Sequence, residues 1–572
     1  MSRSTTTKGL VLVAAISLSM AACTSSSSTP SSSGSSGSSA KQTPLVIEDN
    51  PVATFTNDFN PFDSTSASST ENTNSLVYEP LFQFNTLNST EAPIPWLATA
   101  YAWSNGNKTL TLTLRSNVKW SDGQAFTSAD VDFTFGMLQS QPATNTGGVP
   151  ATTSITTPSP TSVVLNFASP ESANFEAIGS QLIVPQHLWS SVAKPATAVI
   201  SGPNAIGTGP YLVNKFGAQD ITYKTNPSYW GGAPKVAAIS LPAYAGNDAA
   251  TLALASGDID LTGNDINNVQ SVFVAKDPST NHLFQTTAPY FPAGNTVSLL
   301  LNNKDTNAPA LGDATVRAAI SAALDRSSMA SQCETNYENP ATSAGGLTLP
   351  IDQNALDPAE ANDLKSGPDD ATVTSLMTGD GYAKVGGKWT KGGQQVKFTI
   401  IDPNTFTDYW CDAQAMVGEL NNEGFNVTDN GAFTYNSWNT AITTGDFDAA
   451  LHWGQGNTPF QRLQFILDPS TTAAIGSVAA EDFDRYSSPA ATAAVSAYEN
   501  ATTPADEQTA LNSLQALFAK DMPAVPVLYG ASWYEYSTAN FTGWPTSTNA
   551  FINPSPNSQA YEYMILKLSP VS

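Results

Sequence analysis

The segment 452–459 holds the residues best suited to bind a small molecule, because a tryptophan is followed there by glycines and amides. Trp453 ends an apolar run that predicts a strand, and ligands bind in loops at the strand ends of α/β sheets. Gln455 and Asn457 each carry hydrogen-bond donors and acceptors. An aromatic face beside amides can stack on a ligand and bond to its polar atoms, so we expect a binding site here. The alternative is that Trp453 only packs in the core.

Further aromatic and amide residues are candidates for the same binding site. Tyr409, Trp410 and Trp533 are candidates for its walls, and core packing is the alternative for each of them. Phe59 and Asn60 are candidates from a loop near the start of the folded chain. Side chains of these types recognise a ligand through ring contacts and hydrogen bonds.

Catalytic motifs are missing from the sequence. The three histidines, His187, His282 and His452, are widely separated, and neither a His-Glu-x-x-His nor a Gly-x-Ser-x-Gly motif occurs. The segment 381–388 is rich in glycine, but Trp389 takes the place where a phosphate loop has the Ser or Thr that binds magnesium. Paired carboxylates for glycoside hydrolysis remain open among 48 acidic residues. We expect a protein that is not an enzyme and has no metal and no cofactor.

Residues 1–22 have the pattern of a signal peptide that ends before a lipidated cysteine. Their apolar run is too short to span a bilayer, and small residues precede Cys23 as in a lipoprotein cleavage site. Residues 23–40 are rich in Ser and predict a flexible tether. We expect lipid on Cys23 to anchor the protein to the outer face of the cytoplasmic membrane. An ordinary signal peptide with an incidental cysteine is the alternative.

Length, charge and cysteine content narrow the class further. A chain of 572 residues is too long for one core and predicts at least two lobes. The net charge of −25 opposes binding to nucleic acid or anionic lipid. Cys333 and Cys411 are expected to form a disulfide in an oxidising compartment, and two buried thiols are the alternative.

Two distant stretches share one local design, in which a helix ends at a glycine and a short strand follows. They are 252–260 with Gly257 and 438–451 with Gly445. Glycine takes the left-handed conformation that ends a helix, after which the chain turns into the strand. Two such units predict two α/β lobes of similar local construction.

Other local patterns predict single elements. Alternating apolar residues predict a strand over 109–115. Ser128 is expected to cap the start of a helix. An amphipathic helix is predicted over 313–326, where Asp313 and Arg317 have the spacing of a helical ion pair.

Several short segments, taken in order, resemble the family 5 extracellular solute-binding proteins, which deliver peptides and related solutes to ABC importers. The most specific are Gly207-Thr208-Gly209-Pro210-Tyr211 and Asn226-Pro227-Ser228-Tyr229-Trp230-Gly231-Gly232-Ala233-Pro234. The others are 60–62, 78–81, 118–123, 316–320, 325–326, 381–389 and 445–448. The order of these segments carries the resemblance over most of the mature chain. We expect the first two to hold the frame of the first lobe without touching a ligand.

The resemblance implies an α/β protein with the two-lobed periplasmic-binding-protein-like fold of the large, three-subdomain type. Lobe I is expected over 41–300, with a β-rich subdomain inserted at about 86–200. Lobe II is expected over 301–524, and the chain returns to lobe I over 525–572. A hinge would close the lobes around a solute, and the monomeric protein would deliver it to the permease subunits of an ABC importer.

The resemblance also places the segment 452–459 against the ligand, for which an oligopeptide is the first expectation. Peptide binders of this family carry an Asp shortly after the tryptophan, but this chain has Gly, Gln, Gly and Asn at 454–457. A buried ammonium group without a carboxylate is costly, although Asp408 or Asp412 could substitute. The departure makes an oligosaccharide the alternative ligand. A nickel-binding variant that uses His452 and a surface sensor or adhesin are further alternatives.

Overall fold

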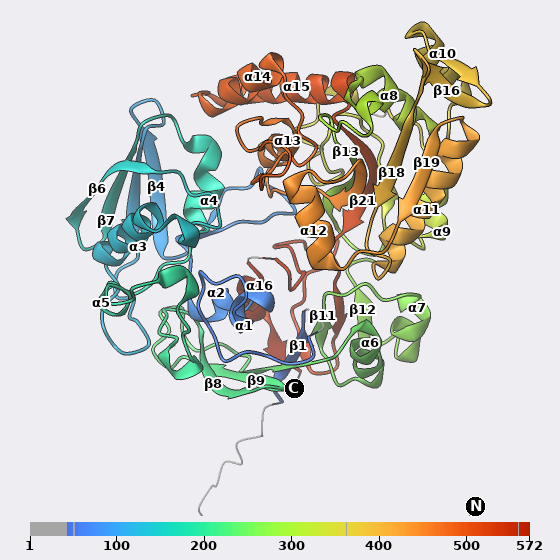
Figure 1. Cartoon of the computed structure of the whole chain (residues 1–572). Helices are drawn as coiled ribbons and strands as arrows, with labels where there is room; N and C mark the ends of the chain where they lie inside the picture. Colours follow the sequence, from blue (N-terminus) through green and yellow to red (C-terminus); the bar gives the residue numbers. More distant parts are fainter. Residues whose placement is uncertain (1–42, 50–51, 362, 559, 572) are drawn as a thin grey trace, which may run out of the picture. The chain divides into compact units, whose positions relative to one another are not determined.

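The computed structural model describes residues 43–49, 52–361, 363–558 and 560–571 (Figure 1). The expected signal peptide, Cys23 and the tether 23–40 lie outside the described residues. Among the described helices, none is both long enough and apolar enough to cross a membrane.

The first lobe is built on a seven-stranded sheet that includes both early and late parts of the chain (Figure 1). In spatial order its strands are β12 (Asn281–Leu283), β22 (Glu535–Ser537), β11 (Leu261–Thr262), β1 (Leu45–Glu48), β10 (Ala238–Pro242), β9 (Asp220–Thr225) and β8 (Tyr211–Gly217). β1 pairs in parallel with β10 and β11, while the outer strands pair antiparallel. Leu45 and Ile47 are buried, so the central strand contributes to the core of this lobe.

The second lobe is built on a six-stranded sheet (Figure 1). In spatial order its strands are β14 (Asn339–Pro340), β21 (Ala524–Ala531), β13 (Ala293–Leu301), β20 (Ala449–Trp453), β18 (Lys397–Ile401) and β19 (Asn426–Asn430). β13 pairs antiparallel with β20 and β21. Most residues of β13 and β20 are buried, so these two strands contribute to the core of the second lobe.

A separate antiparallel sheet forms the β-rich part inserted in the first lobe. Its strands, in order, are β4 (Ala98–Ser104), β5 (Thr109–Leu114), β7 (Ser162–Phe167) and β6 (Thr152–Ser159). β5 matches the strand predicted from alternating residues. Thr127, and not Ser128, caps helix α3 (Ser128–Ser140), because Asp130 completes a capping box with Thr127.

The remaining elements are short sheets and covering helices. The short strands are β2 (Phe82–Gln83), β3 (Ile94–Pro95), β15 (Ala383–Val385), β16 (Lys388–Lys391), β17 (Gln394–Gln395), β23 (Phe541–Thr542) and β24 (Ser569–Pro570). The other α-helices are α1 (Ala67–Thr70), α2 (Asn74–Val77), α4 (Phe175–Gly179), α5 (Gln186–Trp189), α6 (Asn247–Ser256), α7 (Val269–Val272), α8 (Ala314–Ala323), α9 (Arg326–Gln332), α10 (Asp370–Gly379), α11 (Thr407–Asn422), α12 (Tyr435–Thr444), α13 (Pro459–Leu467), α14 (Pro489–Glu499), α15 (Pro504–Asp521) and α16 (Tyr561–Lys567).

The two helix–glycine–strand units form as predicted. Gly257 ends α6 with a φ of 83°, and Gly445 ends α12 with a φ of 77°. Both angles lie in the left-handed region that favours glycine. β11 follows the first unit and β20 follows the second, so each large sheet receives one of these strands.

Over the described residues, the chain passes between the two large sheets twice. One crossing covers residues 284–292, and the other covers residues 532–534. The crossings touch, because the backbone N–H of Ser532 donates to the carbonyl of Pro292 at 2.8 Å. The expected lobe boundaries at 300/301 and 524/525 fall inside β13 and β21. These two strands are paired neighbours that continue up to the crossings.

The segments 207–211 and 226–234 meet at Glu79, which is fully buried in the first lobe. Its carboxylate accepts hydrogen bonds from the Tyr229 hydroxyl at 3.1 Å and from the Trp230 Nε1 at 2.9 Å. Burial raises the pKa of Glu79 to about 7. Gly207 packs so closely on the Val77 carbonyl that an added Cβ would lie 1.7 Å from the oxygen. These contacts hold the frame of the lobe.

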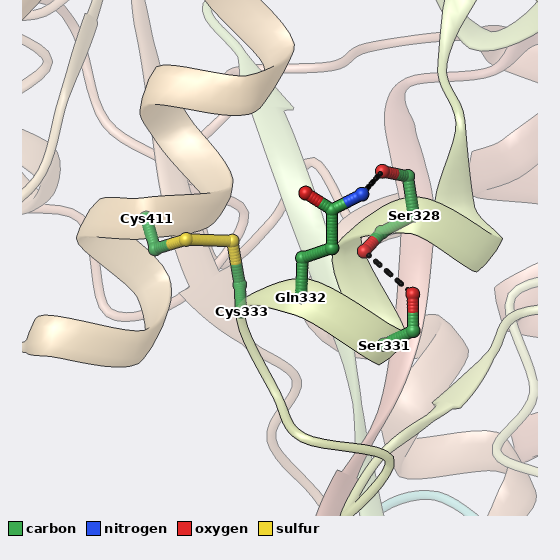
Figure 2. Close-up of a disulfide and its surroundings, with 5 residues drawn as sticks. All are labelled: Ser328, Ser331, Gln332, Cys333 and Cys411. Carbon is green, nitrogen blue, oxygen red and sulfur yellow. Dashed lines mark hydrogen bonds between the residues drawn. A yellow bond between two sulfur atoms is a disulfide. The ribbon is translucent and has the colours of Figure 1, made fainter.

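A disulfide joins Cys333 to Cys411, the pairing that the sequence analysis expects (Figure 2). Cys333 lies at the end of α9, where Gln332 Nε2 donates to Ser328 Oγ at 2.8 Å. Cys411 lies in the first half of α11. The disulfide therefore fixes the part of α11 that carries Tyr409 to a neighbouring helix.

Candidate functional site

A cavity of about 670 Å³ lies between the two lobes. Its lining comes from both lobes and from the second crossing, and includes four aromatic side chains, those of Phe406, Tyr409, Trp453 and Trp533. Six amides also line it, those of Asn247, Asn264, Asn295, Asn457, Asn553 and Asn557. A volume of this size is typical of a site that encloses a small organic ligand. The lining offers stacking faces and many neutral hydrogen-bonding groups.

Trp453 belongs both to the core and to the cavity wall. Its ring lies 5.4 Å from that of Trp438, which is fully buried, and 6.4 Å from that of Phe406. Trp453 itself is half-buried and lines the cavity. Core packing on one side therefore fixes the orientation of a ring that a ligand can reach.

His452 is buried beside this tryptophan and stacks on Trp438, with ring centroids 5.5 Å apart. Burial lowers the pKa of His452 to about 4, so its imidazole is neutral at physiological pH. The described residues contain no group of three or more His, Cys, Asp or Glu side chains placed to hold a metal ion. His452 therefore acts in this structure as an aromatic packing residue.

The loop after Trp453 is held by specific contacts. The N–H of Gly454 donates to the carbonyl of Thr296 at 2.8 Å. Gly456 has a φ of 98°, and a Cβ there would lie 2.6 Å from Gln461. The side-chain oxygen of Gln461 accepts from the N–H of Asn457 at 2.8 Å. The loop is therefore shaped before a ligand arrives, with Asn457 at the cavity.

Trp533 reaches the cavity from the second crossing. Its ring meets Phe291 of the first crossing at 4.9 Å and Tyr337 of the second lobe at 5.9 Å. Such edge-to-face contacts stabilise aromatic pairs. A ligand that touches Trp533 therefore touches the connection between the lobes.

Four predicted site residues lie away from the cavity. Trp410 packs against Gly431, because successive helical residues point about 100° apart and Tyr409 takes the cavity side. Gln455 is exposed and points elsewhere. Phe59 and Asn60 are fully buried in the first lobe, where the Asn60 Nδ2 donates to the carbonyls of Pro195 and Ala198. These last two residues build the frame of the lobe.

Two carboxylates line the cavity from opposite lobes. Asp265 follows β11 in the first lobe, and Asp408 lies in the first turn of α11 in the second. The pKa of Asp265 is raised to about 7, mainly by burial and to a smaller extent by the negative charge of Asp408. Asp408 and Asp412 are both candidates from the sequence to replace the missing Asp, but Asp412 is fully buried and Asp408 lines the cavity. The sequence does not single out Asp265, although it lies in the loop that follows β11, and ligands bind in such loops.

Glu176 of α4 connects the inserted subdomain to the second lobe. Its carboxylate accepts from the Asn457 Nδ2 at 3.1 Å and from the Gln461 Nε2 at 3.2 Å. Glu176 also lines a smaller cavity of about 250 Å³ in the first lobe, which shares Thr86 with the interlobe cavity. This contact holds the ligand loop against the first lobe.

Replacing Glu176 with alanine is expected to loosen this contact. The loss of two hydrogen bonds to a carboxylate should shift the equilibrium toward an open form by about 1–2 kcal/mol. Small-angle X-ray scattering should then give a larger radius of gyration. Glu91→Ala is the matched control, because the hydrogen bonds that its carboxylate accepts among the described residues come from Asn85 and Asn88 of the same lobe. Identical scattering from Glu176→Ala and the original protein would contradict the role of this contact.

Comparison with known proteins places the chain in a family. Residues 92–472 match the sequence profile of the bacterial extracellular solute-binding proteins, family 5 Middle. A protein of Brucella ovis assigned to peptide binding by an ABC transporter is 31% identical over 202 residues, which cover 34% of this chain and 37% of that protein. Protein XP55 of Streptomyces lividans is 25% identical over 427 residues, 73% of this chain and 72% of that protein.

Solved structures show the same fold. The periplasmic oligopeptide-binding protein of Thermotoga maritima is 22% identical and gives a TM-score of 0.82, covering 92% of this chain and 99% of the other. The same protein with mannohexaose bound gives a TM-score of 0.75. These matches confirm the two-lobed architecture predicted from the sequence. The chain therefore belongs to family 5 of the bacterial extracellular solute-binding proteins.

Proposed function

We propose that the protein is the extracytoplasmic solute-binding component of an ABC importer and captures an oligopeptide between its lobes. The observation that carries this proposal is the interlobe cavity, which is lined by residues of both lobes and of the second crossing. A ligand in this position contacts both lobes, so its binding energy would stabilise the closed form. The closed form would then be the state that the permease subunits recognise.

The lining suits an extended peptide. The amide side chains can donate to peptide carbonyls and accept from peptide N–H groups, while Trp453 and Trp533 can contact apolar side chains. Asp408 supplies a carboxylate that an amino terminus requires, although not at the expected place after Trp453. The Brucella relative is itself assigned to peptide binding.

An oligosaccharide is the second candidate. Rings of Trp453 and Trp533 can stack on sugars, and amides can bond to sugar hydroxyls. The Thermotoga neighbour has been crystallised with mannohexaose.

We further propose that the protein acts as a monomer, anchored through lipid on Cys23 to the outer face of the cytoplasmic membrane. The Ser-rich tether would give it reach toward the importer.

Replacing Trp453 with alanine is expected to weaken binding by about 10- to 100-fold, because a large aromatic contact is lost. Ligands are first found by thermal-shift titration with di- to pentapeptides and with cello- and xylo-oligosaccharides. A hundredfold excess over Kd stabilises a folded protein by about 2.7 kcal/mol. Trp410→Ala is the matched control, because Trp410 is half-buried in the same lobe but lies outside the cavity. Equal affinity in Trp453→Ala and the original protein would show that Trp453 belongs to the core alone.

A further inference from the structure

The smaller cavity, of about 250 Å³, lies where the frame of the first lobe meets the inserted subdomain. Residues between positions 61 and 86 form one side of it, and residues from the segments 144–147 and 176–182 of the inserted subdomain form the other. Its volume is just below the range of cavities that enclose drug-sized ligands. The smaller cavity therefore has room for a single ring with its substituents.

The wall of the smaller cavity is polar but almost without charge. Its amide side chains are those of Asn72, Asn74, Gln83 and Gln181, and five Ser and Thr hydroxyls accompany them. Among the described residues that line this cavity there is no Lys, Arg or His, and Glu176 is the one acid. The Glu176 carboxylate already accepts hydrogen bonds from Asn457, Gln461 and Ser180. An ionic solute finds no free charge here, and an apolar one would deprive the amides and hydroxyls of hydrogen bonds.

One amide of this wall keeps unused hydrogen-bonding capacity. The Nδ2 of Asn74 donates to Ser69 Oγ at 3.0 Å, but its buried Oδ1 has no hydrogen-bond partner among the described residues. Buried polar atoms are nearly always hydrogen-bonded in folded proteins. Phe62 and Phe84 add apolar surface to the same wall. A ring that carries hydroxyl groups on its rim and C–H groups on its faces matches both kinds of surface.

Hydrogen-bonded side chains mark the boundary between the smaller cavity and the interlobe cavity. Thr86 lines both cavities, and its hydroxyl accepts from the Asn553 Nδ2 at 3.0 Å. Asn72 of the smaller cavity donates through Nδ2 to the Oδ1 of Asn557 of the interlobe cavity at 3.3 Å. Because these side chains bridge the boundary, the smaller cavity is a compartment of its own.

Glu176 links the smaller cavity to closure of the lobes. It lines this cavity from α4, and its carboxylate holds Asn457 and Gln461 of the second lobe. A molecule that fills the cavity restricts the position of α4 and therefore of this carboxylate. Its binding favours the arrangement in which the hydrogen bonds to the second lobe form.

We propose that the smaller cavity is a second binding site, which takes a neutral cyclic polyol such as a monosaccharide, and that its occupant favours the closed form. This inference goes beyond the proposed function, because the site is separate from the interlobe cavity and its occupant is not the solute that the importer carries. The occupant places hydroxyl groups against the amides of the wall and satisfies Asn74. By linkage, it also raises the affinity of the interlobe cavity for its own ligand.

Isothermal titration calorimetry of the full-length protein with glucose, mannose, xylose and myo-inositol measures this binding. We expect at least one of these probes to bind, and Asn74→Leu to weaken its binding about tenfold, the effect of losing one buried hydrogen bond. Asn214→Leu is the matched control, because Asn214 is an exposed residue of the same lobe whose Nδ2 also donates to a hydroxyl, that of Thr222. Ala177→Leu fills part of the cavity from α4 and should weaken binding as well. Thermal melts without ligand show that each variant is folded.

Two further measurements separate the cavities and test the coupling to closure. Trp453 lines the interlobe cavity and not the smaller one, so Trp453→Ala should leave binding of the monosaccharide intact. Small-angle X-ray scattering should give a smaller radius of gyration when the monosaccharide is added to the original protein. The same addition to Glu176→Ala should leave the radius unchanged, because the hydrogen bonds to the second lobe are lost.

Three results would overturn the second site and leave importer function standing. The first is failure of all four probes to bind in the millimolar range. The second is equal affinity of a probe for the original protein, Asn74→Leu and Ala177→Leu, which would place its site elsewhere. The third is loss of probe binding in Trp453→Ala, which would assign the sugar to the interlobe cavity. Binding that does not change the radius of gyration of the original protein would refute the coupling to closure.

Discussion

Replacing Gly207 with alanine is expected to lower the melting temperature by about 4–8 °C, from a loss of roughly 4–5 kcal/mol, the largest effect of any single methyl group that we foresee. The new Cβ would lie 1.7 Å from the carbonyl oxygen of Val77 and 2.5 Å from its carbonyl carbon. Both are backbone atoms, so no side-chain rotation relieves the overlap. The backbones must separate, which breaks the hydrogen bond from Gly209 N–H to the Val77 carbonyl at 2.9 Å.

Calorimetry or circular dichroism on heating measures this effect. Gly136→Ala is the matched control, because Gly136 lies inside α3 with nothing within 4 Å of an added Cβ. Alanine in an exposed helix should raise stability by about 0.5–1 kcal/mol. A melting temperature of Gly207→Ala within about one degree of the original, on the order of 1 kcal/mol or less, would refute the tight packing at Val77.

Replacing Arg462 with methionine is expected to cost about 3–5 kcal/mol, because it leaves Asp352 as a buried charge without a partner. Both side chains are nearly inaccessible, and their ion pair measures 2.8 Å. Arg462 also donates to the Gly456 carbonyl at 2.8 Å, so its loss should loosen the ligand loop as well. Ligand affinity and stability should therefore fall together.

The pH dependence of the stability loss in Arg462→Met distinguishes an unpaired buried charge from lost packing. Burial already raises the pKa of Asp352, against the opposing effect of Arg462, and removal of Arg462 should raise it further. A carboxyl group with a raised pKa in the folded state costs stability as pH rises. The deficit of Arg462→Met should therefore be larger at pH 7.5 than at pH 4.5. A stability deficit that does not change with pH would show instead that the loss comes from packing. Lys365→Met, which breaks an exposed pair with Asp369, should cost at most about 1 kcal/mol at either pH.

Short sequence patterns predicted the ends of two helices, because the backbone conformation of a single residue determines where a helix ends. Gly257 and Gly445 ended helices as expected, because a left-handed residue ends a helix wherever it occurs. Arg317 did not pair with Asp313 as the helical spacing suggested. Its guanidinium donates to the carbonyls of Leu311, Asp521 and Met522, because that face of α8 is buried against the end of α15. Helical spacing alone contains no information on this tertiary contact.

The composition of the candidate site also depends on tertiary contacts that short sequence patterns do not reveal. Trp453 is the last residue of β20, and Tyr409 lies at the start of α11, which follows β18. Because β18 and β20 are parallel and end at the same edge of the sheet, both residues line the cavity. Asp265 and Asn557 also line it, but their meeting depends on the strand order of the first lobe and on the return of the chain end. Phe59 and Asn60 carry suitable side chains, yet the fold buries them. Residue types indicate which interactions a site could offer, but they do not indicate which residues the fold brings to it.

The contact between the two crossings marks the place about which the lobes can turn. Because Ser532 bonds to Pro292 and Trp533 packs on Phe291, the axis of any lobe rotation passes close to these residues. Atoms near the axis of a rigid rotation are displaced least. The ring of Trp533, which packs on Phe291 beside this axis and lines the cavity, should therefore stay nearly in place while the lobes turn. One wall of the cavity would then be the same in the open and the closed form.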